Sequence, residues 1–254
     1  MKIRGRSFRE ACEELAHRAG CSLERIEQNV VARFNYLDEH GKLLYWKERF
    51  EPGRYGRTKE FFFNHLEDGN VKPGRGSAPL LYHLPEVTQS KTVFITEGEA
   101  HADLLRSWGL TATTLDTGAQ GKLSPQMISQ LSGKKIIILP DNDDPGQAYA
   151  LHLARALQGK AEHLRIVDLP GLQEKGDIID WAAIESNNFE LFMKIVHDTP
   201  AWEAPQELRT LDSGKVTHLV LTPSENEWED PLLFDTTDTP DIPCNLLPVW
   251  LGDY

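Results

Sequence analysis

The chain has 254 residues, of which 40% are hydrophobic and 9% aromatic, and its formal net charge is −12 at pH 7. This composition is typical of a globular protein with a hydrophobic core, and no stretch approaches the roughly 20 apolar residues of a membrane helix. The three cysteines form no Cys-x-x-Cys pair and the N-terminus lacks the apolar core of a signal peptide, so we expect a cytoplasmic protein without zinc, disulfides or a membrane partner.

Residues 1–90 are expected to form a small mixed α+β subdomain. An amphipathic helix is predicted over 7–19, where a serine N-cap precedes a regular apolar face. Alternating β-type residues over 30–50, interrupted by an Asp-Glu-His-Gly turn, predict a hairpin. Shorter strands are predicted at 61–63 and 80–82.

An apolar run over 136–139 ends in two acids one residue apart, Asp141 and Asp143. Residues two apart in extended chain point to the same side, so both carboxylates can face one point. Carboxylates held this close repel each other unless a cation lies between them, and hard divalent ions accept such oxygen ligands. A helix is expected next, with Asp144 as its N-cap and Pro145 at its first position.

Two further predicted strands also run into acids. The strand at 93–95 is followed by Glu97, where Gly98 is expected to let the backbone turn tightly into a helix, and the strand at 164–169 precedes Asp177. Each acid alone could simply cap or start a helix. Because open parallel sheets build their sites at the carboxyl ends of the strands, the acids together predict one metal-binding site.

The order of these motifs resembles the Toprim domain of primase–helicase proteins from phages and mobile elements, which are related to bacterial-type DNA primases. The similar segments are TEGEAHADLL, TATTLDTGAQG, ILPDNDDPGQAYA and LPGLQEKGDIIDWA, all within residues 91–200. The resemblance implies an α/β fold with a Toprim-type βαβ parallel sheet, preceded by the small subdomain. It implies that Glu97, Asp141 and Asp143 are catalytic and, with Asp177, bind Mg²⁺ or Mn²⁺.

The N-terminal subdomain resembles the basic subdomain that precedes Toprim in bacterial primases. The similar order comprises a Gly-Lys hairpin, an arginine, a lysine before aromatic residues, a basic loop and a Leu-Tyr pair. The resemblance implies that template and nucleotide phosphates are bound by Arg49, Lys59, Lys72 and Arg75. The zinc ribbon that accompanies this subdomain in the family is absent from the sequence.

Residues 201–254 carry eleven acidic and two basic side chains and are punctuated by prolines. We interpret this segment as a linker or tail that leads toward a helicase-type domain. The sequence has no GxxxxGK[ST] motif, so no ATP-driven motor is expected within it.

The resemblance implies a DNA primase-type nucleotidyltransferase that makes RNA primers from ribonucleoside triphosphates on single-stranded DNA. Its setting would be the replication of a phage, plasmid or mobile element, with a replicative helicase as partner. Two alternatives stay open. The same acids could activate water in a Toprim nuclease, or the chain could be a non-catalytic module that binds nucleic acid or nucleotide for a separate helicase.

Overall fold

The computed structural model describes residues 2–3, 6–7, 18 and 28–204. Contacts divide the chain into the units Met1–Gln206 and Glu207–Tyr254, and every described residue belongs to the first unit. The helix predicted over 7–19 falls almost wholly outside the described residues, as does most of the segment 201–254. None of the helices described has the length and apolar character needed to cross a bilayer.

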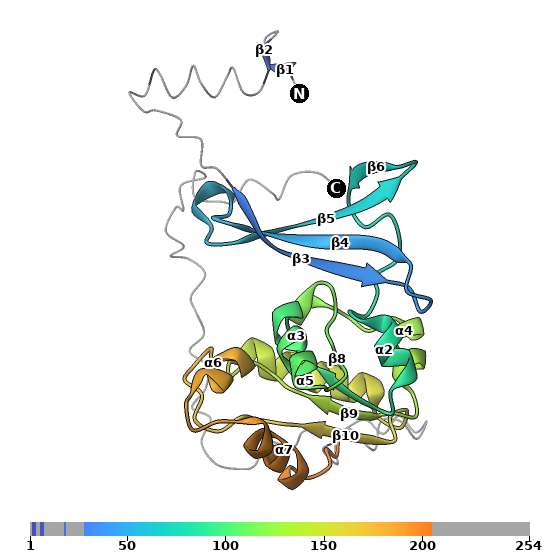
Figure 1. The fold of residues 1–254 in the computed structure, drawn as a ribbon, viewed down its shortest axis with the longest axis vertical. Helices are drawn as coiled ribbons and strands as arrows, with labels where there is room; N and C mark the ends of the chain where they lie inside the picture. Colours follow the sequence, from blue (N-terminus) through green and yellow to red (C-terminus); the bar gives the residue numbers. More distant parts are fainter. Residues whose placement is uncertain (1, 4–5, 8–17, 19–27, 205–254) are drawn as a thin grey trace, which may run out of the picture. The chain divides into compact units, whose positions relative to one another are not determined.

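The N-terminal part is built around an antiparallel sheet of order β3-β4-β5-β6 (Figure 1). The predicted hairpin is confirmed: the Asp38 amide donates to the Lys42 carbonyl, and Gly41 takes the positive φ of 84° that the turn requires. A two-stranded hairpin of β1 (Lys2–Ile3) and β2 (Arg6–Ser7) and a short 3-10 helix η1 (Arg54–Gly56) complete this part. The four strands are Asn29–Leu37 (β3), Leu43–Glu51 (β4), Glu60–Glu67 (β5) and Asn70–Pro73 (β6).

The register of this sheet places one set of side chains on a single face. Tyr36 pairs with Tyr45, which pairs with His65, and Lys47 lies opposite Phe63. Tyr36 and Tyr45 are fully buried and their rings stack 4.7 Å apart. This face therefore packs against the second half of the chain, where its tyrosines join the main hydrophobic core.

The second half contains a four-stranded sheet of order β10-β9-β7-β8 in which all pairs are parallel. Its strands are short and apolar, as expected for a sheet buried on both faces. The predicted α/β fold class, a parallel sheet that follows a smaller unit, is confirmed. The strands are Thr92–Ile95 (β7), Ala112–Thr113 (β8), Lys135–Ile138 (β9) and His163–Ile166 (β10).

Helices connect and cover these strands. On α5, residues Tyr149, Leu153 and Leu157 recur every fourth position and are buried, which is the spacing of a helix face against a core. Helix α7 packs on the sheet through Phe192, whose ring lies 5.9 Å from that of Phe94. The helices are Leu84–Gln89 (α2), Glu99–Ser107 (α3), Gly118–Gln120 (η2), Pro125–Leu131 (α4), Asp144–Leu157 (α5), Ile178–Ala183 (α6) and Phe189–Asp198 (α7).

Two predicted strands differ from the structure. Residues 80–82 form no strand but an isolated antiparallel bridge between Leu81 and Leu115, beside which the Tyr82 amide donates to the Thr114 carbonyl. The strand predicted over 164–169 ends at Ile166, and the Val167 amide still donates to the carbonyl of Ile138.

Candidate functional site

Glu97 lies just beyond the carboxyl end of β7, and its carboxylate reaches the neighbouring strand end. Its Oε1 accepts a hydrogen bond from the Asp141 amide at 3.0 Å. A Cβ on Gly146 would lie only 2.5 Å from Glu97 Oε1 and from the Asp141 carbonyl oxygen. Glycine is thus needed at 146 so that the Glu97 carboxylate can lie against the first turn of α5.

Gly98, in contrast, does not need to be glycine for its backbone conformation. Its φ is −126°, which is ordinary extended backbone, and a Cβ there would be 3.5 Å from its nearest neighbour, His101. The prediction that Gly98 permits a tight turn is therefore wrong, since the chain enters α3 through an extended N-cap.

Asp141 and Asp143 both lie at the carboxyl end of β9, but they have different local roles. Asp143 is the N-cap of α5, and its Oδ1 accepts from the Gly146 amide at 2.8 Å. The expected cap, Asp144, is instead the first residue of the helix, because the turn ends one residue earlier than predicted. Asp141 makes no cap, and its carboxylate faces α3.

Asp177 caps α6 in a reciprocal capping box with Asp180. Its Oδ1 accepts from the amides of Ile179 and Asp180, while Asp180 Oδ2 accepts from the Asp177 amide. Its second oxygen, Oδ2, lies 3.1 Å from His101 Nε2. Asp177 is thus fixed at the edge of the same acidic region.

His101 is the residue of this site that sequence reasoning missed. It lies in the first turn of α3, four residues after Glu97, with Nδ1 3.5 Å from Asp141 Oδ1 and Nε2 3.1 Å from Asp177 Oδ2. Its side chain is only 14% exposed. The available signal was its spacing of about one helical turn from Glu97, but a single histidine at such a position has many possible roles.

The ionisation of these groups shows that the four acids share one electrostatic environment. Burial, followed by the charges of Glu97, Asp177 and Asp143, raises the pKa of Asp141 to about 6, although His101 opposes this rise. Burial and the charge of Asp143 also raise the pKa of Glu97, against the hydrogen bond from the Asp141 amide. Mutual repulsion of buried carboxylates is the situation that a bound cation relieves.

His101 and Asp177 form an ion pair in which each group favours the charged form of the other. Burial alone would lower the pKa of His101, but its hydrogen bond to Asp177 and the charges of Asp141 and Glu97 raise it above the ordinary value. The same hydrogen bond lowers the pKa of Asp177 to about 2 against the effect of burial. Asp177 is therefore ionised at neutral pH.

The oxygen donors fit a hard divalent cation in chemical type, since Mg²⁺ and Mn²⁺ bind carboxylates. Burial, together with the charges of neighbouring acids, raises the pKa values of Glu97 and Asp141, and this supports the fit. Within the part of the chain that the structure describes, however, no three His, Cys, Asp or Glu side chains are already arranged to hold a metal ion. Asp143 and Asp177 are engaged as helix caps, and His101 lies between Asp141 and Asp177.

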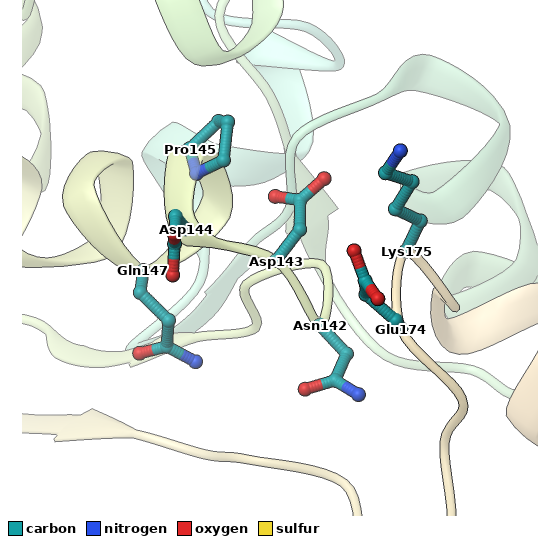
Figure 2. Close-up of a pocket in the computed structure, with 7 residues that line it drawn as sticks. All are labelled: Asn142, Asp143, Asp144, Pro145, Gln147, Glu174 and Lys175. Atoms are coloured by element: carbon teal, nitrogen blue, oxygen red, sulfur yellow. The ribbon is translucent and has the colours of Figure 1, made fainter.

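A cavity of about 580 Å³ opens beside Asp143, between the start of α5 and the loop before α6 (Figure 2). Asn142 joins the two walls: its amide donates to the Gly176 carbonyl, and its side chain donates to the carbonyls of Leu172 and Gln173. In Figure 2 the side chains of Asp143 and Lys175 extend toward the same side of the cavity. The lining residues are Asn142, Asp143, Asp144, Pro145, Gln147, Glu174 and Lys175.

The four basic residues predicted to bind phosphates do not form one cluster. Arg49 pairs with Phe61 across the strands, and Lys72 pairs with His65, so both share the sheet face of Lys47. Arg49 also forms an ion pair with Glu51. Lys59 is exposed just before β5. This face therefore carries a basic residue at each end, with the exposed ring of Phe61 next to Arg49.

Arg75 is engaged elsewhere. Its guanidinium contacts both carboxylate oxygens of Asp116, which is 2% exposed, and lies 4.1 Å from the ring centroid of Phe63. The Tyr45 hydroxyl donates to the same carboxylate at 2.8 Å. The charge of Arg75 is therefore largely matched within the protein.

A buried ion pair holds the antiparallel sheet against the acidic region. Lys47 Nζ lies 2.7 Å from Glu99 Oε1 and 2.9 Å from the Asp116 carbonyl oxygen. The Tyr36 hydroxyl donates to Glu99 Oε1 at 2.7 Å. Because Glu99 is the first residue of α3, two positions after Glu97, this pair fixes β4 relative to the acids.

Comparison with known proteins gives matches to solved structures alone: no family model and no curated protein matches the chain. The Aquifex aeolicus primase (zinc binding and RNA polymerase domains) matches with a TM-score of 0.51 at 17% identity, over 67% of this chain and 40% of that chain. A DNA primase domain from Pseudomonas aeruginosa matches with a TM-score of 0.48 at 18% identity, over 66% of this chain and 50% of that one. The primase fragment of the bacteriophage T7 primase-helicase matches with a TM-score of 0.42 at 16% identity, over 72% and 70% of the two chains.

The matched region spans two fifths of the Aquifex structure. At this level of identity the match concerns the fold. The chain thus has a primase-like fold, and its acidic residues lie at the carboxyl ends of the central parallel strands.

Proposed function

We propose that this chain is a Toprim-type primase module that joins ribonucleotides into RNA primers on a single-stranded DNA template. The observation that carries the proposal is the group of half-buried acids at the ends of β7 and β9, where burial first and the charges of neighbouring acids second raise the pKa values of Glu97 and Asp141, on a primase-like fold. Partly buried carboxylates with raised pKa values that lie beside one another are typical of functional sites.

In this proposal a divalent cation is held by Glu97, Asp141 and Asp143, with Asp177 at the edge of the site. When bound, Mg²⁺ or Mn²⁺ would favour ionisation of the attacking hydroxyl and neutralise triphosphate charge. The hydrogen bond from the Asp141 amide orients Glu97, and the ion pair with His101 keeps Asp177 ionised. The buried pair of Lys47 and Glu99 holds the acids at a fixed position relative to the antiparallel sheet.

The antiparallel sheet would supply the surface for template and nucleotide. Arg49 and Lys72 share the face of the sheet from which Lys47 reaches α3, and the exposed ring of Phe61 can stack on a base. Lys59 would add a phosphate contact. In this proposal Arg75 has a structural role, because Asp116 already binds its guanidinium.

We further propose the division into an N-terminal subdomain over 1–90, a Toprim domain over 91–200 and a tail over 201–254, with a replicative helicase as the partner. The biological setting would be the replication of a phage, plasmid or other mobile element.

The experiment is a priming reaction with the full chain, circular single-stranded DNA, four ribonucleotides of which one is labelled, and Mg²⁺ or Mn²⁺. We expect short labelled RNA with the wild type and none with Asp141→Asn. Asp198→Asn, which removes an exposed acid at the end of α7, is the matched control and should retain synthesis.

The other outcomes would overturn the proposal in distinguishable ways. Metal-dependent cleavage of the DNA without primers would identify a nuclease. DNA or nucleotide binding without either reaction would identify a non-catalytic module. Primer synthesis that Asp141→Asn leaves intact would place the reaction away from the acids.

A further inference from the structure

A second cavity, of about 440 Å³, lies at the opposite edge of the parallel sheet from the acids. Thr92 and Lys135 begin β7 and β9, whereas Glu97 and Asp141 follow the ends of these strands. The cavity lies between this amino edge and α7, which is labelled beside β9 and β10 in Figure 1. Its volume is within the range of about 300–1,000 Å³ that is typical of small-molecule pockets.

The register of the sheet places three of the residues that line this cavity side by side. Phe94, Ile137 and Arg165 are directly paired across three adjacent strands and so lie in one row on one face. Helix α7 contributes Met193 and Val196 as the facing wall. One end of the row is therefore apolar and aromatic, and the other end carries a guanidinium.

Arg165 has an unusual environment. Its Nε is fully buried and has no hydrogen-bond partner among the described residues. Buried donors in proteins are nearly always satisfied, so a guanidinium at a cavity whose Nε has no described partner is suited to an acceptor on a bound ligand. Arginine is well suited to phosphate or carboxylate because its planar fork can donate two parallel hydrogen bonds.

The residues that line the cavity give it a positive charge. Lys135 and Arg165 both line it, His197 is at its rim, and none of its lining residues is acidic. Neither Lys135 nor Arg165 forms an ion pair within the part of the chain described by the structure. Two formal positive charges match a phosphate monoester, which carries about −1.5 to −2 at pH 7, better than a single carboxylate.

We propose that this cavity binds a phosphate monoester of a flat aromatic group, such as a nucleoside monophosphate. The phosphate contacts Arg165 and Lys135, and the aromatic body lies against the partly exposed apolar lining formed by Leu110 and Met193. The proposal does not depend on the function assigned to the acids, because the two sites lie at opposite edges of the sheet.

The test is isothermal titration calorimetry on the full chain in EDTA, which keeps the acidic site free of metal. The probes are adenosine 5′-monophosphate, phenyl phosphate, adenosine and inorganic phosphate. We expect both aromatic phosphates to bind at least about tenfold more tightly than adenosine or inorganic phosphate, which corresponds to about 1.4 kcal/mol.

Substitutions decide whether the bound probe lies in this cavity. Arg165→Gln and Lys135→Gln should each weaken binding of adenosine 5′-monophosphate about tenfold or more. Arg155→Gln, which removes an exposed arginine of α5, should leave it unchanged. Because Lys135 is exposed, its variant keeps the test valid if Arg165→Gln fails to fold.

Three results would overturn the proposal. They are an absence of measurable binding, equal binding of inorganic phosphate and the aromatic phosphates, and binding that both cavity variants leave unchanged.

Discussion

The carboxyl group of Asp141 is held in an environment that disfavours its ionised form. Burial and the nearby charges of Glu97, Asp177 and Asp143 raise its pKa to about 6, from 3.8. At pH 7 the charged Asp141 carboxylate is therefore partly buried in the folded chain, whereas it is exposed to water in the unfolded chain. A site built in this way lowers the stability of the metal-free fold, and a cation would restore it.

Asp141→Asn should accordingly stabilise the metal-free protein at pH 7. Removal of the repelling charge is expected to raise the free energy of unfolding by about 1–2 kcal/mol, less than the full shift implies because the group is partly exposed and also contacts His101. Urea unfolding in EDTA measures this. A clear loss of stability would show that Asp141 contributes favourably to the fold without metal.

The raised pKa of Asp141 also determines how the stability of the fold changes with pH. Because the folded pKa lies above the unfolded value, protonation of Asp141 favours the folded state. Its penalty is fully present above about pH 6 and is relieved as the pH falls toward 4. The stability advantage of Asp141→Asn over the wild type should shrink between pH 7 and pH 4. An advantage that stays constant over this range would contradict the raised pKa.

Gly146 and Gly98 offer a matched pair of substitutions beside the acids. Gly146→Ala places a Cβ 2.5 Å from the Glu97 carboxylate and the Asp141 carbonyl, so we expect a loss of about 2–3 kcal/mol. Gly98→Ala meets only ordinary contacts, and its cost should stay near the roughly 1 kcal/mol of a weakened N-cap. Thermal or urea unfolding compares the two, and equal losses would show that the close approach at 146 is unimportant.

At the scale of elements, the attachment of β4 to α3 depends on a buried ion pair. Lys47→Met leaves the Glu99 carboxylate buried with the Tyr36 hydroxyl as its remaining described partner, and should cost about 3–5 kcal/mol. Lys47→Met combined with Glu99→Gln should cost less than Lys47→Met alone, because no charge is then left unpaired. Urea unfolding measures both.

The control for this experiment is the pair of Arg49 and Glu51, whose side chains are 34% and 40% exposed. Arg49→Met should cost at most about 1 kcal/mol, as is usual for a solvated ion pair. If Lys47→Met were equally mild, the buried pair would not be what fixes the antiparallel sheet against α3.

The sheet face that carries Arg49 and Lys72 is the surface proposed to bind single-stranded DNA. If both side chains contact phosphates, their joint replacement by glutamine should weaken binding of single-stranded DNA and lower the slope of log affinity against log salt by about 1.4. Fluorescence anisotropy over a salt series measures this slope. The control is the joint replacement of the exposed Lys160 and Lys194, and an equal change in that variant would mean that the effect is one of net charge alone.

For the molecule as a whole, the sequence predicts best what depends on local pattern. The parallel strands and their acidic ends follow from short apolar runs, and the structure places Glu97 and Asp141 in direct contact as a result. The N-cap of α5 lies one residue before the predicted position: two adjacent aspartates have the same intrinsic capping ability, and in the fold it is the Asp143 carboxylate that accepts from the Gly146 amide.

What the sequence did not predict depends on contacts between distant segments. His101 joins the acids because the fold brings the first turn of α3 against Asp141 and Asp177, which are 40 and 76 positions away in the chain. Lys47 meets Glu99, 52 positions away, when the two sheets pack. The resemblance to bacterial primases groups Arg75 with the phosphate-binding residues, whereas the fold brings its guanidinium to Asp116.

The central claim is that the acids form a divalent-metal centre. Calorimetric titration of the metal-free chain with Mn²⁺ tests it most directly, with Asp141→Asn and the surface control Asp198→Asn measured beside the wild type. We expect saturable binding by the wild type and by Asp198→Asn, and a loss of at least about tenfold in affinity in Asp141→Asn. Equal binding by all three proteins, or none by the wild type, would contradict it.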